Sequence, residues 1–276
     1  MILQTPVEIT KANFEIGPMN RLLFVGSCFA DNVGRRFVEN QFRAEANPYG
    51  VMYNPASVMH TVAHWCQEQK KCSKEVQDLR VVMTLGTNHV YIERATGEIV
   101  DNCQKRPQAL FEERELSVAE CADYLWQAVE MLRGLCTDVK VIVTVSPIRY
   151  AKYGMHGSQL SKATLQLAAN ELIKRCDDGG IAYFPAYEIM NDELRDYRFY
   201  EPDMLHPTSQ AVDYICQRFK DMFFSGEARQ FENEWQPISR ALKHRPFNPD
   251  SEEYKKFIAQ AHIDEKEFVR KWKLDT

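Results

Sequence analysis

Short apolar runs alternate along the chain with stretches in which apolar residues recur every third or fourth position. The runs at 22–25, 81–85, 139–145 and 181–184 are apolar and partly β-branched, and each predicts a β-strand. The run at 139–145 is apolar at nearly every position, which indicates a strand buried on both faces, as in a parallel sheet.

Helical patterns follow most of these runs. Asn54-Pro55 is typical of a helix start, because Asn caps the helix and Pro fits its first turn. Ser117 and Glu120 have the spacing of a capping box. The order of strands and helices predicts right-handed crossovers. We therefore expect a three-layer, flavodoxin-like α/β fold, with a parallel sheet of about five strands and helices on both faces.

Two parts of the chain depart from this alternation. Residues 89–101 predict a hairpin that turns at Thr96-Gly97. Residues from about 226 onward are charged and aromatic, contain several prolines and show no strand pattern. We therefore expect one α/β domain at 1–225 and a helical C-terminal extension at 226–276. The extension should pack on the same domain, near the carboxyl ends of the strands.

Composition and charge narrow the class of protein. The 276 residues are 45% hydrophobic and 26% charged, with a formal net charge of −5, which is ordinary for a soluble globular protein. No basic stripe points to nucleic acid, and no apolar run is long enough to cross a membrane. The first residues lack the pattern of a secretory signal. None of these features determines the oligomeric state.

The eight cysteines include no CxxC pair. We expect them to be reduced, buried thiols of a cytoplasmic protein rather than a disulfide framework or a zinc site. His60 and His64 have the i, i+4 spacing of metal ligands, but no third ligand lies nearby in the sequence. We therefore expect neither a metal nor an organic cofactor.

The residues that follow the predicted strands are the candidates for function, because ligands of open parallel sheets bind beyond the carboxyl ends of the strands. Ser27 follows the strand at 22–25 and precedes a helix. Its hydroxyl could act as a nucleophile, and the free N–H groups of the helix start could bind an oxyanion. The alternative is that Ser27 only caps the helix.

Asp203 and His206 stand three residues apart, just before Pro207. Imidazole acts as a base near neutral pH, and a carboxylate on its other nitrogen holds the ring in one tautomer. Such pairs are also common surface features. The expectation that Ser27 and this pair both follow strands of one sheet favours a shared site.

Gly86-Thr87-Asn88 ends the strand at 81–85. A glycine allows substrate to approach closely, and the Asn88 amide could donate a hydrogen bond to an oxyanion. The backbone N–H of Gly50 could do the same from a neighbouring loop. The alternative is a turn without catalytic function.

The run Gly26-Ser27-Cys28-Phe29-Ala30 is the signature of the GSCFA family, which resembles a branch of the SGNH hydrolase superfamily. The resemblance implies an SGNH-hydrolase-like fold in which Ser27, His206 and Asp203 form a catalytic triad. The oxyanion donors would be the N–H groups of Ser27 and Gly50 and the amide of Asn88. Two positions depart from the superfamily motifs, since His89 replaces an Asp and no Asp precedes Ser27. Other stretches that resemble the family are NPYGVMYNP (47–55), LGTNHVY (85–91), TVSPIRY (144–150) and DMLHPTSQAV (203–212).

Three further residues have alternative interpretations. Cys28 is intrinsically a better nucleophile than a serine, but a side chain one position on should point elsewhere, which favours packed core. His89 could contact substrate or lie on the hairpin surface. Arg149 follows the most buried strand and could bind an anionic substrate group or form a structural salt bridge.

The resemblance implies a serine-dependent ester hydrolase that acts through an acyl-enzyme on Ser27. Its partner would be a small-molecule ester, such as an acetylated sugar or a related metabolite. Two alternatives remain: an O-acyltransferase that uses the same triad, and a non-catalytic carbohydrate-binding protein on a decayed hydrolase fold.

Overall fold

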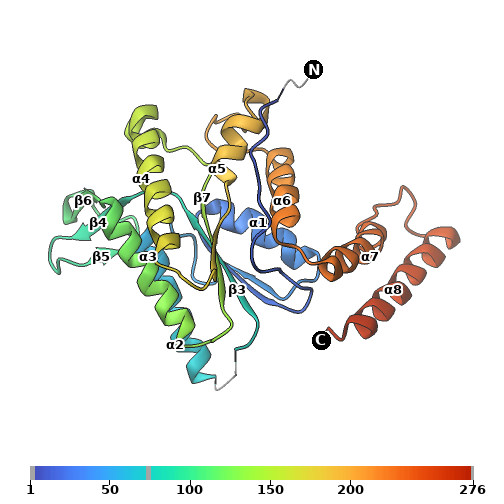
Figure 1. Cartoon of the computed structure of the whole chain (residues 1–276). Helices are drawn as coiled ribbons and strands as arrows, with labels where there is room; N and C mark the ends of the chain where they lie inside the picture. Colours follow the sequence, from blue (N-terminus) through green and yellow to red (C-terminus); the bar gives the residue numbers. More distant parts are fainter. Residues whose placement is uncertain (1–3, 73–75, 275–276) are drawn as a thin grey trace.

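The computed structural model describes residues 4–72 and 76–274. Its centre is a five-stranded parallel sheet with the strand order β2-β1-β3-β7-β8 (Figure 1). This confirms the predicted α/β architecture, including all four strands expected from apolar runs. The fifth strand, β2, lies at the edge of the sheet. The strands are β1 (Arg21–Gly26), β2 (Ala44–Ala46), β3 (Leu79–Leu85), β7 (Lys140–Val145) and β8 (Ile181–Tyr183).

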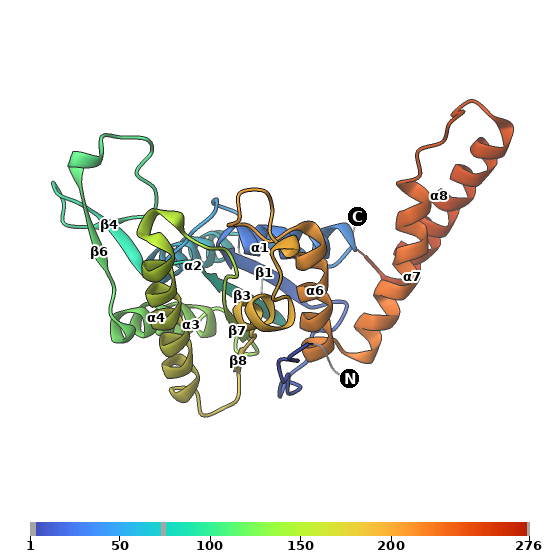
Figure 2. The same cartoon turned by 90° about the horizontal axis from the view of Figure 1, so that it is seen from above.

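Helices cover both faces of this sheet (Figure 2). Successive side chains of a strand point to opposite faces, so Leu22 and Phe24 of β1 join one apolar cluster, while Leu23 and Val25 join the other. The first cluster packs against α1 (Cys28–Glu39), α5 (Ala186–Glu188) and α6 (Ser209–Phe223), and the second against α2 (Pro55–Lys71), α3 (Val118–Arg133) and α4 (Gly154–Lys174).

A small antiparallel sheet with the order β5-β4-β6 projects from one side of the molecule (Figure 2). The predicted hairpin forms from β4 (His89–Glu93) and β5 (Ile99–Val100), with Gly97 in the left-handed region at φ 73°. The third strand, β6 (Phe111–Glu115), was not predicted. Short irregular helices occupy Gln108–Leu110, Ala151–Tyr153, Ile189–Glu193 and Tyr197–Phe199.

The C-terminal residues form two helices, α7 (Gly226–Leu242) and α8 (Glu252–Trp272), as expected. Their position differs from the prediction. Trp235 of α7 donates its indole N–H to the carbonyl of Glu39, at 2.9 Å, where α1 ends. α1 begins at the carboxyl ends of the strands and runs antiparallel to them. Its last turn therefore lies near the amino ends of the strands. The expected location near the strand exits is therefore wrong, because aromatic side chains of α7 pack on the far end of α1.

Two structural properties bear on the class of protein. No helix within residues 4–72 and 76–274 combines the length and the apolar character that a bilayer crossing requires. All eight cysteines are free thiols. The expectation of burial holds for half of them, namely Cys66, Cys121, Cys136 and Cys216.

Candidate active site

The loops that follow β2, β3 and β7 meet at the carboxyl edge of the sheet. The N–H groups of Gly86 and Thr87 donate to the carbonyl of Tyr53, at 2.8 and 2.9 Å. The N–H of Arg149 donates to the carbonyl of Leu205 at 3.0 Å, which joins the β7 exit to the loop that carries the Asp–His pair. The candidate segments thus lie along one edge.

Asp203 and His206 form a hydrogen-bonded pair, with Nδ1 of the imidazole 2.6 Å from Oδ2 of the carboxylate. The other carboxylate oxygen accepts the N–H groups of Leu205 and His206, at 2.8 and 3.0 Å. The backbone N–H of His206, that of Leu205 and the imidazole together lower the pKa of Asp203 to about 2. A carboxylate that stays ionised holds the proton on Nδ1, so Nε2 is left as the basic nitrogen.

The His206 side chain is 43% exposed, and Nε2 forms no hydrogen bond within the described residues. The loop around it is tightly turned, because Met204 has a left-handed φ of 59° and the N–H of Glu201 donates to the carbonyl of His206 at 2.8 Å. Within the described residues, neither Ser27 nor Cys28 is hydrogen-bonded to the imidazole.

Ser27 is the N-cap of α1 and is 0% exposed. Its hydroxyl accepts the N–H of Phe29 at 3.2 Å and lies 3.1 Å from the hydroxyl of Thr84 on β3. The preceding Gly26 has a φ of 132°, and a Cβ there would lie 2.0 Å from the carbonyl oxygen of Thr84. This close approach turns the Ser27 hydroxyl toward the sheet, where it performs the capping role that the sequence left as an alternative.

The three predicted oxyanion donors are already hydrogen-bonded within the fold. The N–H of Ser27 donates to the carbonyl and the hydroxyl of Thr84, at 3.1 and 3.0 Å. The N–H of Gly50 donates to the carbonyl of Asn47 at 2.9 Å. The buried amide of Asn88 donates to the carbonyl of Leu116 at 2.8 Å. Any oxyanion site at this edge therefore needs other donors or a rearranged loop.

Asn47 has a structural role that the sequence did not indicate. Its side-chain oxygen accepts the N–H of Gly26 at 2.8 Å, and its amide donates to Asp31 in the first turn of α1 at 2.7 Å. The Asn47 backbone is itself left-handed, with a φ of 42°. This buried amide ties the β2 exit to the turn that carries Ser27 and Cys28.

Cys28 is partly exposed, and the buried part of its side chain packs against the first apolar cluster, so the expectation of a packed side chain holds in part. Its sulfur lies 3.7 Å from the hydroxyl of Tyr53, and the Tyr53 ring meets that of Tyr150 edge to face at 6.0 Å. Burial, followed by the neighbouring Cys28, raises the pKa of Tyr53 to about 12. Sequence reasoning singled out neither tyrosine, because no motif marks an aromatic residue that reaches back across a sheet edge.

His89 lies away from the Asp–His pair, in the small sheet. Its ring stacks on that of Tyr153 at 3.6 Å, and its side chain is only 10% exposed between Glu113 and Glu115. Burial lowers the pKa of His89, and this effect is larger than the opposite effect of the two carboxylates. The structure therefore gives His89 a packing role, different from both a substrate contact and a surface position.

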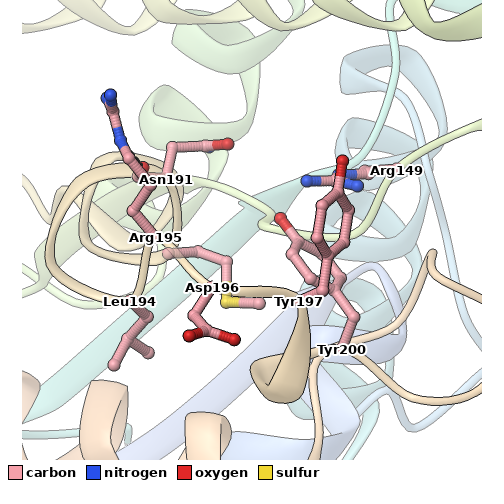
Figure 3. Close-up of a pocket in the computed structure, with 8 residues that line it drawn as sticks. Arg149, Asn191, Leu194, Arg195, Asp196, Tyr197 and Tyr200 are labelled. Carbon is pink, nitrogen blue, oxygen red and sulfur yellow. Dashed lines mark hydrogen bonds between the residues drawn. The ribbon is translucent and has the colours of Figure 1, made fainter.

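Arg149 lies beside the Asp–His loop and lines a cavity of about 340 Å³ (Figure 3). Its guanidinium stacks on the ring of Tyr200 at 3.8 Å. No carboxylate pairs with it in residues 4–72 and 76–274, so the salt-bridge alternative finds no partner there. Tyr197, Asn191 and Arg195 line the same cavity (Figure 3).

The buried side chain of Lys162 on α4 links the segments that follow β3 and β7 through hydrogen bonds. It is 1% exposed, and its ammonium nitrogen lies 2.6 Å from the carbonyl of Gly86 and 2.9 Å from that of Ser146. Burial lowers the pKa of Lys162 to about 7. The sequence contained a signal for this position, since Lys162 stands three residues before Leu165 and so on the buried face of the helix.

His60 and His64 do not face a common centre. Nδ1 of His60 lies 2.8 Å from a carboxylate oxygen of Asp101, whereas His64 stacks on Tyr49 at 4.0 Å. No group of three or more potential metal ligands gathers in the part of the chain that the structure describes.

Comparison with known proteins identifies the family. The GSCFA family model matches residues 21–80 and 77–219, and a model described as the GSCFA domain protein, C-terminal domain, matches residues 235–271. Because these matches span well over half of its length, the chain belongs to the GSCFA family. No curated protein matches it significantly.

Solved structures resemble the fold at low sequence identity. A member of the lipolytic protein G-D-S-L family from Veillonella parvula is 12% identical with a TM-score of 0.48, covering 74% of this chain and 97% of its own. A carbohydrate esterase family 3 structure from Talaromyces cellulolyticus is 12% identical with a TM-score of 0.45, covering 78% and 99%. At these TM-scores the likenesses carry no argument on function.

Proposed function

We propose that this protein is an ester hydrolase that transfers an acyl group to water through a covalent acyl-enzyme. The observation that carries the proposal is the Asp203–His206 pair at the carboxyl edge of the sheet. Its carboxylate accepts two backbone N–H groups as well as the imidazole N–H. Activation of a hydroxyl or thiol requires a base oriented in this way, and its Nε2 forms no hydrogen bond in the described part of the chain.

The nucleophile in this proposal comes from the turn between β1 and α1. The sequence prediction places it on Ser27, with Cys28 as the alternative. This turn lies at the same edge as the Asp–His pair, and the N-terminus of α1 favours negative charge there. His206 first takes the proton of the nucleophile and then returns it to the leaving alcohol.

The cavity beside Arg149 is our candidate for the alcohol part of the substrate. Tyr197 provides an exposed ring face, while Arg149 and Asn191 provide polar groups (Figure 3). An apolar face combined with a few polar groups is typical of small-molecule sites. A sugar that carries a small acyl group has matching chemistry, with C–H faces for the ring and hydroxyls for the polar groups.

The experiment that tests the proposal measures hydrolysis of short p-nitrophenyl esters and of acetylated oligosaccharides by the wild type and by His206→Ala. We expect His206→Ala to lower kcat/KM by roughly 10²-fold or more. A matched control is His262→Ala, because His262 pairs with Glu265 three residues away at 3.1 Å on α8.

Equal rates in the wild type and in His206→Ala would remove the basis of the proposal. Absence of turnover by the wild type, with retained binding of sugars, would favour the non-catalytic alternative. Faster loss of the acyl group when sugar acceptors are added would favour an O-acyltransferase.

A further inference from the structure

Two adjacent residues offer a nucleophile at the start of α1, and their surroundings differ. Ser27 is 0% exposed, and its hydroxyl is held between Thr84 and the N–H of Phe29. Cys28 is partly exposed at the edge of the sheet. From this contrast we infer that the thiol of Cys28, and not the hydroxyl of Ser27, is the nucleophile. The inference rests on the proposed function.

The backbone at Cys28 supports this assignment. Cys28 is the first residue of α1, and its N–H has no hydrogen-bond partner among the described residues. The N–H of Ser27 is occupied by Thr84. In acyl transfer the oxyanion forms next to the nucleophile, within reach of the N–H of that same residue. An attack by Cys28 thus has a free donor at a positive helix end, which an attack by Ser27 lacks.

Two tyrosine hydroxyls near the start of α1 could donate to an acyl group bound at Cys28. The hydroxyl of Tyr53 lies 3.7 Å from the sulfur. The hydroxyl of Tyr150 is buried and has no hydrogen-bond partner in the described part of the chain. Gly86 leaves room for it, since a Cβ there would lie 2.4 Å from the Tyr150 oxygen. The carbonyl oxygen of an acyl group bound at Cys28 would give these donors a partner.

The proposed base, His206, lies close to the start of α6, a helix that neighbours α1. His206 lies three residues before Ser209, where α6 begins. The helices α1 and α6 are side by side (Figures 1 and 2), joined by Arg36, whose guanidinium lies 2.6 Å from Asp213 and 3.0 Å from the hydroxyl of Ser209. The β7 exit, which carries Arg149 and then Tyr150, is bonded to the His206 loop through Leu205.

The reaction then has two halves. In the first, Nε2 of His206 takes the proton of the Cys28 thiol, and the sulfur bonds to the ester carbonyl carbon. The C–O bond to the alcohol breaks, the alcohol leaves with the proton from the imidazole, and a thioester remains on Cys28. In the second half, water gives a proton to His206 while its oxygen attacks the thioester. The C–S bond breaks, the sulfur recovers the proton, and the carboxylic acid leaves.

The test compares Cys28→Ala with Ser27→Ala and Ser27→Gly in the ester assay. We expect Cys28→Ala to lower kcat/KM by roughly 10³-fold or more, since it removes the nucleophile. Both Ser27 variants should keep activity within about tenfold, with lower thermal stability. Glycine is included because it replaces a capping serine at small cost and so guards against a variant that fails to fold.

Mass spectrometry of the full-length wild type gives a second readout. The acyl adduct should map to Cys28 and be released by neutral hydroxylamine, as thioesters are. Iodoacetamide should inactivate the wild type and modify Cys28 more slowly in His206→Ala. The exposed Cys72 serves as the control thiol, whose modification should not depend on His206.

The outcomes separate this inference from the proposed function. An oxygen-ester adduct on Ser27, or an inactive Ser27→Gly beside an active Cys28→Ala, would overturn the inference and leave the hydrolase intact. Activity that survives at both positions and in His206→Ala would end the proposed function itself.

Discussion

The buried Lys162 makes the stability of the protein depend on pH in a calculable way. The perturbation is Lys162→Met, which keeps an unbranched side chain, one atom shorter than that of lysine, and removes the amine. In the wild type the amine lies 2.6 and 2.9 Å from two backbone carbonyls, and burial lowers its pKa from 10.5 to about 7. Because the folded pKa is depressed, the unfolded state binds more protons between pH 7 and 10.5. The free energy of unfolding therefore rises with pH across this window.

The size of the effect follows from the two pKa values. Between pH 7 and pH 9, Lys162 should add about 2 kcal/mol to the free energy of unfolding of the wild type, out of about 5 kcal/mol over the whole window. At pH 9 the neutral amine still donates to the carbonyls of Gly86 and Ser146. Lys162→Met leaves them without a donor and should be less stable there by roughly 1–3 kcal/mol. Its deficit should shrink by about 2 kcal/mol at pH 7.

The assay is urea unfolding at pH 7, 8 and 9, with Lys255→Met as a control on the surface of α8. The difference between wild type and variant removes the contribution of the tyrosines and cysteines that titrate at higher pH. Equal pH slopes in the wild type and in Lys162→Met would refute the reasoning, because they would mean that the amine titrates alike in the folded and unfolded chain.

Three further substitutions test the turn, the C-terminal helices and the base. Gly26→Ala should destabilise the protein by about 4 kcal/mol or more, since a Cβ would lie 2.0 Å from the carbonyl of Thr84. Urea unfolding measures this loss, and Gly226→Ala is the control, because a Cβ at that position meets nothing within 4 Å. Trp235→Ala should cost about 3–5 kcal/mol but leave kcat/KM of the folded protein unchanged, and a lower kcat/KM would show that α7 contributes to the site. Asp203→Asn should lower kcat by roughly 10²–10⁴-fold at neutral pH, because the imidazole loses the partner that holds its tautomer; a change below threefold would mean that the pair is only structural.

The parts of the fold that could be predicted are the buried elements, because burial leaves a pattern of apolar residues in the sequence. The run at 139–145 corresponds to β7 at Lys140–Val145, between β3 and β8 in the centre of the sheet. The edge strand β2 has only three residues, all partly exposed, so no apolar run marks it. β6, with the sequence FEERE, is exposed at all but its first residue and becomes a strand only by pairing with β4. Pairing partners distant in sequence leave no local pattern.

In the candidate site, too, contacts between residues close in sequence could be predicted, whereas contacts with residues distant in sequence could not. The contact between Asp203 and His206 is local, so the spacing of the two residues was enough to predict it. Whether a backbone N–H remains free depends on tertiary neighbours. Asn47 occupies the N–H of Gly50, and Leu116 occupies the amide of Asn88. A motif can therefore place a donor near a strand exit without showing that the donor is available.

The choice between Ser27 and Cys28 depends on one backbone angle. Gly26 has a φ of 132° and lies so close to Thr84 that the next residue, Ser27, faces β3 and caps α1. The side chain that follows, on the first residue of the helix, then points toward the edge of the sheet. We therefore expect the conformation of Gly26 to decide which of the two candidate nucleophiles meets a substrate.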